Sequence, residues 1–244
     1  MDATRPAVLA LPGLLCDDTI WEPQVAGLAD IADVTIADFA QLDDLTAMAR
    51  AALDLVDGPV HVVGHSMGGR VAFEIWRLAP ERVRSLVVLD TGSHPAAPNE
   101  ADSRQVLLDV SAQQGMRALA DAWLPPMVHP DRRDDPAFMG SLVDMVMRAT
   151  PEQHARQIHA LLTRPDASPL LGTITVPTLV IVGRDDEWSP VAQHEKIAAA
   201  IPTARLEIVE DSGHMVTLER PEAVTALLRD WLISRESLAE AGRS

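Results

Sequence analysis

One short stretch, Gly64-His65-Ser66-Met67-Gly68-Gly69, constrains the fold of this chain more than any other. The residues before it, Val60 to Val63, include three valines and predict a buried strand. The residues after it, Arg70 to Ala79, place apolar side chains at helical spacing and are followed by Pro80, so they predict a helix. The chain therefore has to reverse within this stretch, with the hydroxyl of Ser66 pointing out of the turn.

The spacing of the glycines indicates a chemical use for this turn. Gly64 and Gly68 flank Ser66 two residues away on each side, which is the pattern G-x-S-x-G. Between a strand and a helix, this pattern holds the serine in a strained conformation as an exposed nucleophile. The glycines lack the Cβ atoms that would collide where strand and helix pack closely. The alternative is a tight connection with an incidental serine, but the position between strand and helix favours the nucleophile.

The rest of the chain alternates short apolar runs with amphipathic segments. This alternation predicts an α/β protein in which helices cover both faces of a mostly parallel sheet of about six strands. The residues after the last expected helix, 236–244, are expected to fray. Strands are expected at residues 7–11, 34–36, 60–63, 86–89, 178–182 and 206–209, and core helices at 45–56, 70–79, 190–200 and 221–232.

The alternation stops in the middle of the chain. Prolines divide the segment from His94 to Pro169 into pieces, and helices are expected there at 106–123, 138–149 and 152–162. A structureless loop of this length inside a compact domain would be unusual, so an inserted helical region is expected. The predicted division is a first part of the α/β core (1–93), a helical insertion (94–169) and a second part of the core (170–244).

Charge and cysteine content limit the partners and the compartment. The chain has 36 acidic and 20 basic residues, a formal net charge of −16. Such a surface repels phosphate backbones and anionic lipids, so we expect neither nucleic acid nor a membrane as partner. A single cysteine allows no internal disulfide, and no segment has the pattern of a signal peptide or a membrane span. We therefore expect a cytoplasmic monomer or homodimer.

The partners that a nucleophilic serine needs are present beyond the insertion. Ser66 requires a base to take its proton and an acid to orient that base. His214 lies in a Gly-His turn after the last expected strand, and Asp185 and Asp186 follow the strand before it. Asp90, at the end of an earlier strand, is a third candidate acid. Because the carboxyl ends of parallel strands meet at one rim, these side chains are expected to lie close together.

Four stretches together make the chain resemble small α/β-hydrolase-fold serine hydrolases of the esterase, lactonase and non-haem perhydrolase kind. The resemblance extends from about residue 7 to residue 232. The matching stretches are Leu11-Pro12-Gly13 with Trp21, Gly64 to Gly69, Pro177 to Gly183 with Asp186 and Pro190, and Gly213-His214 with Glu219 and Pro221.

The resemblance implies a fold, a set of roles and a reaction. The fold is the α/β-hydrolase fold, with residues 94–169 as a lid. Ser66 is implied as nucleophile, His214 as base and Asp186 as acid, since it lies three residues after Gly183 and four before Pro190. The implied oxyanion hole consists of two backbone N–H groups. These belong to Leu14 and Met67.

The expected reaction is hydrolysis of a small apolar carboxylic ester through an acyl-enzyme. The same three residues would also serve a lactone, a carbon–carbon bond or perhydrolysis, and a non-catalytic ligand-binding protein on this fold is a further alternative. No G-x-G-x-x-G follows the first strand, and the histidines of the insertion lack metal-ligand spacing. We therefore expect no cofactor and no metal.

Several large side chains are candidates for the substrate pocket, with ordinary core packing as the alternative. The Arg132-Arg133 pair would suit a substrate carboxylate, but the neighbouring aspartates favour a solvated surface loop instead. The pocket candidates are Trp123, Met127, Met145, Met147 and Trp188.

Overall fold

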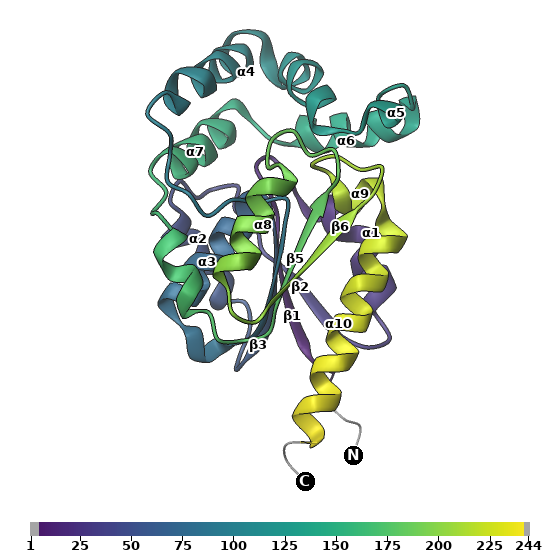
Figure 1. Cartoon of the computed structure of the whole chain (residues 1–244). Coiled ribbons are helices and arrows are strands. Elements are labelled where there is room, and N and C mark those ends of the chain that lie inside the picture. Colours follow the sequence, from purple (N-terminus) through teal and green to yellow (C-terminus); the bar gives the residue numbers. More distant parts are fainter. Residues whose placement is uncertain (1–4, 242–244) are drawn as a thin grey trace.

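The computed structural model describes residues 5–241 and contains one six-stranded sheet in the order β2-β1-β3-β4-β5-β6 (Figure 1). All neighbouring strands are parallel. The predicted parallel sheet of about six strands is therefore confirmed. The strands are β1 (Ala7–Leu11), β2 (Asp33–Ile36), β3 (Val60–His65), β4 (Val83–Leu89), β5 (Thr178–Gly183) and β6 (Ala204–Val209).

Helices cover both faces of the sheet, with α2, α3 and α8 on one face and α1 and α10 on the other (Figure 1). Four more helices, α4 to α7, lie between β4 and β5 in the chain and gather beyond one end of the sheet (Figure 1). The helices are α1 (Glu22–Leu28), α2 (Leu45–Leu53), α3 (Met67–Leu78), α4 (Glu100–Trp123), α5 (Pro130–Arg133), α6 (Pro136–Arg148), α7 (Pro151–Leu162), α8 (Val191–Ala200), α9 (Val216–Glu219) and α10 (Pro221–Ala241). Short 3-10 turns occur at Asp18–Trp21, Pro80–Arg82, Pro125–Met127 and Ser168–Thr173.

The central strands form the middle of the core. Every residue of β3 and β5 is buried, whereas the edge strand β2 has no fully buried residue. This difference follows from the apolar runs, because a parallel strand covered by helices on both faces must be apolar on both sides. None of the helices that the structure describes combines the length and the apolar composition needed to cross a bilayer.

Several elements differ from the sequence-based expectation, among them the short helices α5 and α9, which lie in segments where no element was predicted. Helix α1 occupies a segment for which no element was predicted; it has Pro23 in its first turn, a position where the missing proline N–H costs no helical hydrogen bond. Helix α10 runs on to Ala241 instead of ending near residue 232. Its extension has a buried partner, since Nε2 of His61 donates to Glu236 over 3.0 Å, and Arg84 pairs with the same carboxylate. The remainder of the expected frayed end, residues 242–244, lies outside the described residues.

The turn from β3 to α3 depends on close backbone contacts. A Cβ atom on Gly64 would come within 2.3 Å of the Gly68 carbonyl oxygen, and one on Gly68 within 2.1 Å of the Leu11 carbonyl oxygen. Real Cβ atoms do not approach backbone oxygens this closely. Glycine is therefore required at both positions if β1, β3 and α3 are to meet as they do.

We predict that Gly68→Ala lowers the free energy of unfolding by about 1–3 kcal/mol or more, because the backbone oxygen of Leu11 cannot yield as a side chain would. The matched control is Gly140→Ala in α6, where a Cβ meets no atom within 4 Å. That change is expected to raise stability by about 0.5–1 kcal/mol through helix propensity. Urea unfolding of both variants gives the comparison, and equal midpoints would contradict the prediction.

Candidate active site

Ser66 lies in the sharp turn between β3 and α3, with φ of 55° and ψ of −114°. A non-glycine residue in this region is strained by roughly 1–3 kcal/mol, so surrounding contacts must hold it. The end of β4 supplies them. The Ser66 N–H donates to the Leu89 carbonyl over 2.8 Å, and the Thr91 hydroxyl donates to the Ser66 carbonyl over 2.6 Å. The Ser66 side chain is only partly buried and lines a cavity.

His214 is the side chain that contacts the Ser66 hydroxyl. Its Nε2 lies 2.8 Å from Ser66 Oγ, and its Nδ1 lies 2.8 Å from Oδ2 of Asp186. A carboxylate can only accept, so the ring proton is on Nδ1 and Nε2 is left to accept the serine hydroxyl. The structure thus brings together three residues from the ends of β3, β5 and β6.

Asp186 is held by its own loop as well as by His214. Its Oδ1 accepts the N–H groups of Trp188 and Ser189, both over 2.8 Å. Burial acts to raise the pKa of Asp186, but the facing His214 and these hydrogen bonds outweigh burial and lower it. The carboxylate is therefore ionised at neutral pH.

The other two candidate acids have other hydrogen-bond or ion-pair partners. The Asp185 side chain is 45% exposed, and its carboxylate lies 3.5 Å from Nε2 of His129. Asp90 is fully buried and accepts the N–H groups of Gly183 (2.9 Å) and Val216 (3.4 Å). Burial raises the pKa of Asp90 well above its usual value. Of the three, only Asp186 hydrogen-bonds His214 among the residues that the structure describes.

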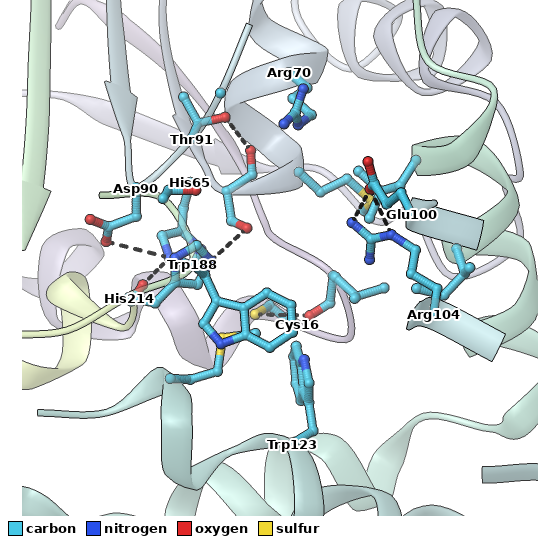
Figure 2. Close-up of a pocket in the computed structure, with 18 of the residues that line it drawn as sticks. Cys16, His65, Arg70, Asp90, Thr91, Glu100, Arg104, Trp123, Trp188 and His214 are labelled. Atoms are coloured by element: carbon cyan, nitrogen blue, oxygen red, sulfur yellow. Dashed lines mark hydrogen bonds and ion pairs between the residues drawn. The ribbon is translucent and has the colours of Figure 1, made fainter. Parts of the chain in front are cut away.

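His65, next to the serine in sequence, hydrogen-bonds the backbone of the loop that carries His214. Its Nε2 donates to the His214 carbonyl over 2.7 Å and lies 3.8 Å from Oδ2 of Asp90. Burial, together with repulsion from His214, lowers the pKa of His65 to about 3. The ring is therefore neutral, and its role here is to position the His214 backbone (Figure 2).

Glu219 fixes the same loop from the other side. Its Oε1 accepts the N–H groups of Gly213 (2.9 Å) and Met215 (3.2 Å), and its Oε2 accepts that of His129 (2.8 Å). His214 thus lies between two amides tied to one buried carboxylate. The sequence indicates Glu219 only as part of a matching stretch, because the fold alone reveals which amides it reaches.

The two residues of the implied oxyanion hole, Leu14 and Met67, both border the cavity. Met67 is the first residue of α3, and both residues line the same cavity as Ser66. Within residues 5–241, neither N–H donates a hydrogen bond. The loop that carries Leu14 is fixed at its next residue, where the Leu15 N–H donates to Oε1 of Gln157 over 2.8 Å.

A cavity of about 290 Å³ opens beside Ser66, at the small end of the range for ligand sites. Trp123, Met127 and Trp188 line it, the first two buried and Trp188 43% exposed. The expectation for the other two methionines is not met. Met145 faces a separate cavity near the β1–α1 loop, and Met147 is exposed to solvent, because the two residues lie on different faces of α6.

Two other groups of side chains also have clear positions. Arg132 stacks on Phe138 at 4.3 Å, and Arg133 donates to the Val128 carbonyl, so this pair packs against its own segment.

Cys16 lines the cavity, but burial raises the pKa of its thiol to about 12, which keeps it protonated. In the part of the chain that the structure describes, no three His, Cys, Asp or Glu side chains are grouped to hold a metal ion.

Known proteins resemble this chain in sequence and in fold. The model of a family described as "Alpha/beta hydrolase family" matches residues 5–227. RutD of Pseudomonas savastanoi, to which carbamate hydrolysis is ascribed, is 31% identical over 258 residues, covering 94% of this chain and 95% of that protein.

Solved structures give the same result. A thermophilic esterase from Thermogutta terrifontis, determined with malate bound, has a TM-score of 0.87 and 29% identity, covering 96% of this chain and 91% of its own. The enol-lactonase from Burkholderia xenovorans has a TM-score of 0.85 and 26% identity, covering 95% and 92%.

We predict that Glu219→Gln lowers the free energy of unfolding by about 1–3 kcal/mol, because an amide NH₂ replaces one of the acceptor oxygens that face buried N–H groups. Glu219→Ala should cost more, since all three amides then lose their acceptor. The control is Glu222→Gln on the exposed start of α10, which should stay within about 0.5 kcal/mol of the parent. Denaturant unfolding measures all three; a Glu219→Gln protein as stable as the control would refute the role of this carboxylate.

Proposed function

The chain belongs to the alpha/beta hydrolase family and is a hydrolase, and from that premise we propose that it cleaves a carboxylic ester of a small substrate. The observation that carries the proposal is the unbroken chain of hydrogen bonds from Ser66 through His214 to Asp186, with both links at 2.8 Å. In the proposal, Ser66 is the nucleophile, His214 the general base and Asp186 the group that orients it.

The first half of the reaction forms an acyl-enzyme. As Oγ of Ser66 bonds to the ester carbonyl carbon, its proton passes to Nε2 of His214, and the carbonyl electrons move onto the oxygen. The ionised Asp186 stabilises the resulting imidazolium through Nδ1. When the tetrahedral intermediate collapses, the bond to the leaving oxygen breaks and His214 returns the proton to the departing alcohol.

The negative oxygen of that intermediate needs donors placed in advance. The N–H groups of Leu14 and Met67 are proposed for this, because both border the cavity at Ser66 and neither is used within residues 5–241. Removing one such donor in a well-studied protease costs about 10²–10³ in turnover. Water then attacks the acyl group by the same route, and the carboxylic acid leaves.

Residues 94–169 are proposed as the lid that selects the substrate. Helices α4 and α7 and the turn before α5 contribute Leu107, Trp123, Met127 and Ile158 to the cavity wall, so part of this wall is apolar. A lactone would be attacked by the same three residues, and the similarity to an enol-lactonase favours a lactone as the second candidate substrate.

We predict that Ser66→Ala cuts turnover of p-nitrophenyl esters by roughly three to six orders of magnitude while the unfolding midpoint stays close to that of the parent. The parent should also react with a serine-directed fluorophosphonate, and peptide mass spectrometry should place the label on Ser66. Retention of more than about a tenth of the activity, or a label on another serine, would remove Ser66 as the nucleophile.

The identity of the acid has a separate test. Asp186→Asn is expected to lower turnover by about four orders of magnitude, the loss seen for the same change in a serine protease triad, because a histidine without its carboxylate adopts the wrong tautomer. Asp185→Asn is the matched control: the neighbouring carboxylate is exposed and should lose far less. A larger loss in Asp90→Asn than in Asp186→Asn would move the acid to the end of β4.

A further inference from the structure

One end of the cavity beside Ser66 carries an excess of positive charge. Arg70, Arg104 and Arg164 all line it, together with one carboxylate at the same end, Glu100. Figure 2 shows Glu100 and Arg104 on the opposite side of the view from His214, with Arg70 at the top. Three guanidinium groups therefore lie at an end of the cavity that holds a single carboxylate.

The hydrogen-bond donors of Arg164 are all occupied by acceptors of the protein itself. Its Nη1 and Nη2 donate to the two oxygens of Glu100 over 2.8 and 2.7 Å. The remaining N–H groups donate to the carbonyls of His94, Pro95 and Leu161. Every donor of this guanidinium has a partner, and its side chain is 1% exposed. Arg164 therefore balances Glu100 and anchors the end of α7.

Only some of the hydrogen-bond donors of Arg104 have acceptors. Its Nε and Nη2 both approach the same oxygen of Glu100, at 2.8 and 2.7 Å. Within residues 5–241, its Nη1 has no hydrogen-bond acceptor. Although burial acts to raise it, the pKa of Glu100 falls to about 2 because of the two arginines, so this carboxylate is ionised and already neutralised by Arg164. The two arginines and Glu100 together therefore carry one net positive charge.

Arg70 has no carboxylate partner among the described residues. It donates through Nη1 to the His94 carbonyl over 2.9 Å, and its Nη2 lies 3.5 Å from the His94 ring. Burial, with repulsion from Arg164, lowers the pKa of Arg70 to about 9, which still leaves it charged at neutral pH. A partly buried cation without a counter-charge is costly unless an anion joins it.

The position of Arg70 connects this charge to the chemistry. Arg70 lies four residues after Ser66, one turn into α3, and its N–H donates to the Ser66 carbonyl over 3.4 Å. Although Ser66 itself lies in the strained turn before the helix, both residues line the same cavity. A substrate attacked at Ser66 would extend towards Arg70 and Arg104.

We propose that this end of the cavity binds a carboxylate of the substrate, held by Arg70 and Arg104. The substrate class is then a monoester of a short dicarboxylic acid, or a lactone with a free carboxylate; this rests on the proposed function. The guanidinium fork matches a carboxylate in shape and charge. The small volume of the cavity limits the chain between the carboxylate and the ester carbonyl to a few carbons.

The test compares kcat/KM for monomethyl succinate, glutarate and adipate with methyl butyrate, pentanoate and hexanoate, which replace the free carboxylate by a methyl group. The parent should favour the anionic member of at least one pair. Arg104→Gln and Arg70→Gln should each lower that preference roughly ten- to a hundredfold, the value of a lost charge-assisted hydrogen bond. Arg104→Lys keeps the charge without the fork and should fall in between.

The matched control is Arg117→Gln on the same helix α4. Arg117 is 66% exposed and pairs with Asp121, so its loss should leave the preference unchanged. If both cavity variants keep the parent's preference while the neutral esters are still hydrolysed, the carboxylate site is refuted and the esterase proposal stands.

A binding measurement separates the two proposals. Titration calorimetry of Ser66→Ala with succinate, glutarate and adipate should detect one of them, and adding Arg104→Gln should weaken that binding by roughly tenfold or more. Such binding supports the carboxylate site even if no ester is turned over. A lack of ester turnover would refute only the proposed ester hydrolysis. Absence of binding by all three dicarboxylates overturns the site.

Discussion

The arrangement of the site depends on two places where backbone touches backbone without a side chain between. At Gly68, the start of α3 lies against the Leu11 carbonyl, which brings the loop of Leu14 to the serine turn. At Gly183, a Cβ would come within 2.1 Å of the Gly213 carbonyl oxygen, so the loops that carry Asp186 and His214 are in direct contact. These approaches fix the distances between groups that are far apart in sequence, and side chains then only complete the alignment.

Buried carboxyl groups around these contacts accept hydrogen bonds from backbone amides. Asp186, Asp90 and Glu219 each accept two or three N–H groups from the loops at the rim. An unpaired buried carboxylate would cost several kcal/mol, so each of these residues stabilises one loop conformation against others. Their loops are therefore held in place before any substrate enters, which is the condition for a hydrogen-bond chain such as Ser66–His214–Asp186 to be aligned in advance.

The sequence predicts the parts of this arrangement that are local or ordered along the chain. Ser66 and His214 could be selected because each follows the end of an expected strand, and a parallel sheet brings those ends together. Asp186 could be selected among the aspartates from its spacing to Gly183 and Pro190. The orientation of α4 to α7 could not be predicted. Gly115, with φ of 85°, bends α4 in the middle, and the faces of α6 are set by contacts with distant segments, so Met127 and Met145 could not be told apart.

The position of the cavity arginines also depends on contacts that the sequence does not reveal. From the sequence, Arg70 was placed only at the start of a helix and was given no role, and the sharing of Glu100 between Arg104 and Arg164 depends on how α4 meets the end of α7. The net charge of −16 argues against large anionic partners, which meet the outer surface. A small carboxylate is different: exposed charges are screened beyond about 8 Å at physiological ionic strength, while guanidinium groups inside the cavity act at contact distance with little water between. An acidic surface and an anion-binding cavity are therefore compatible in one protein.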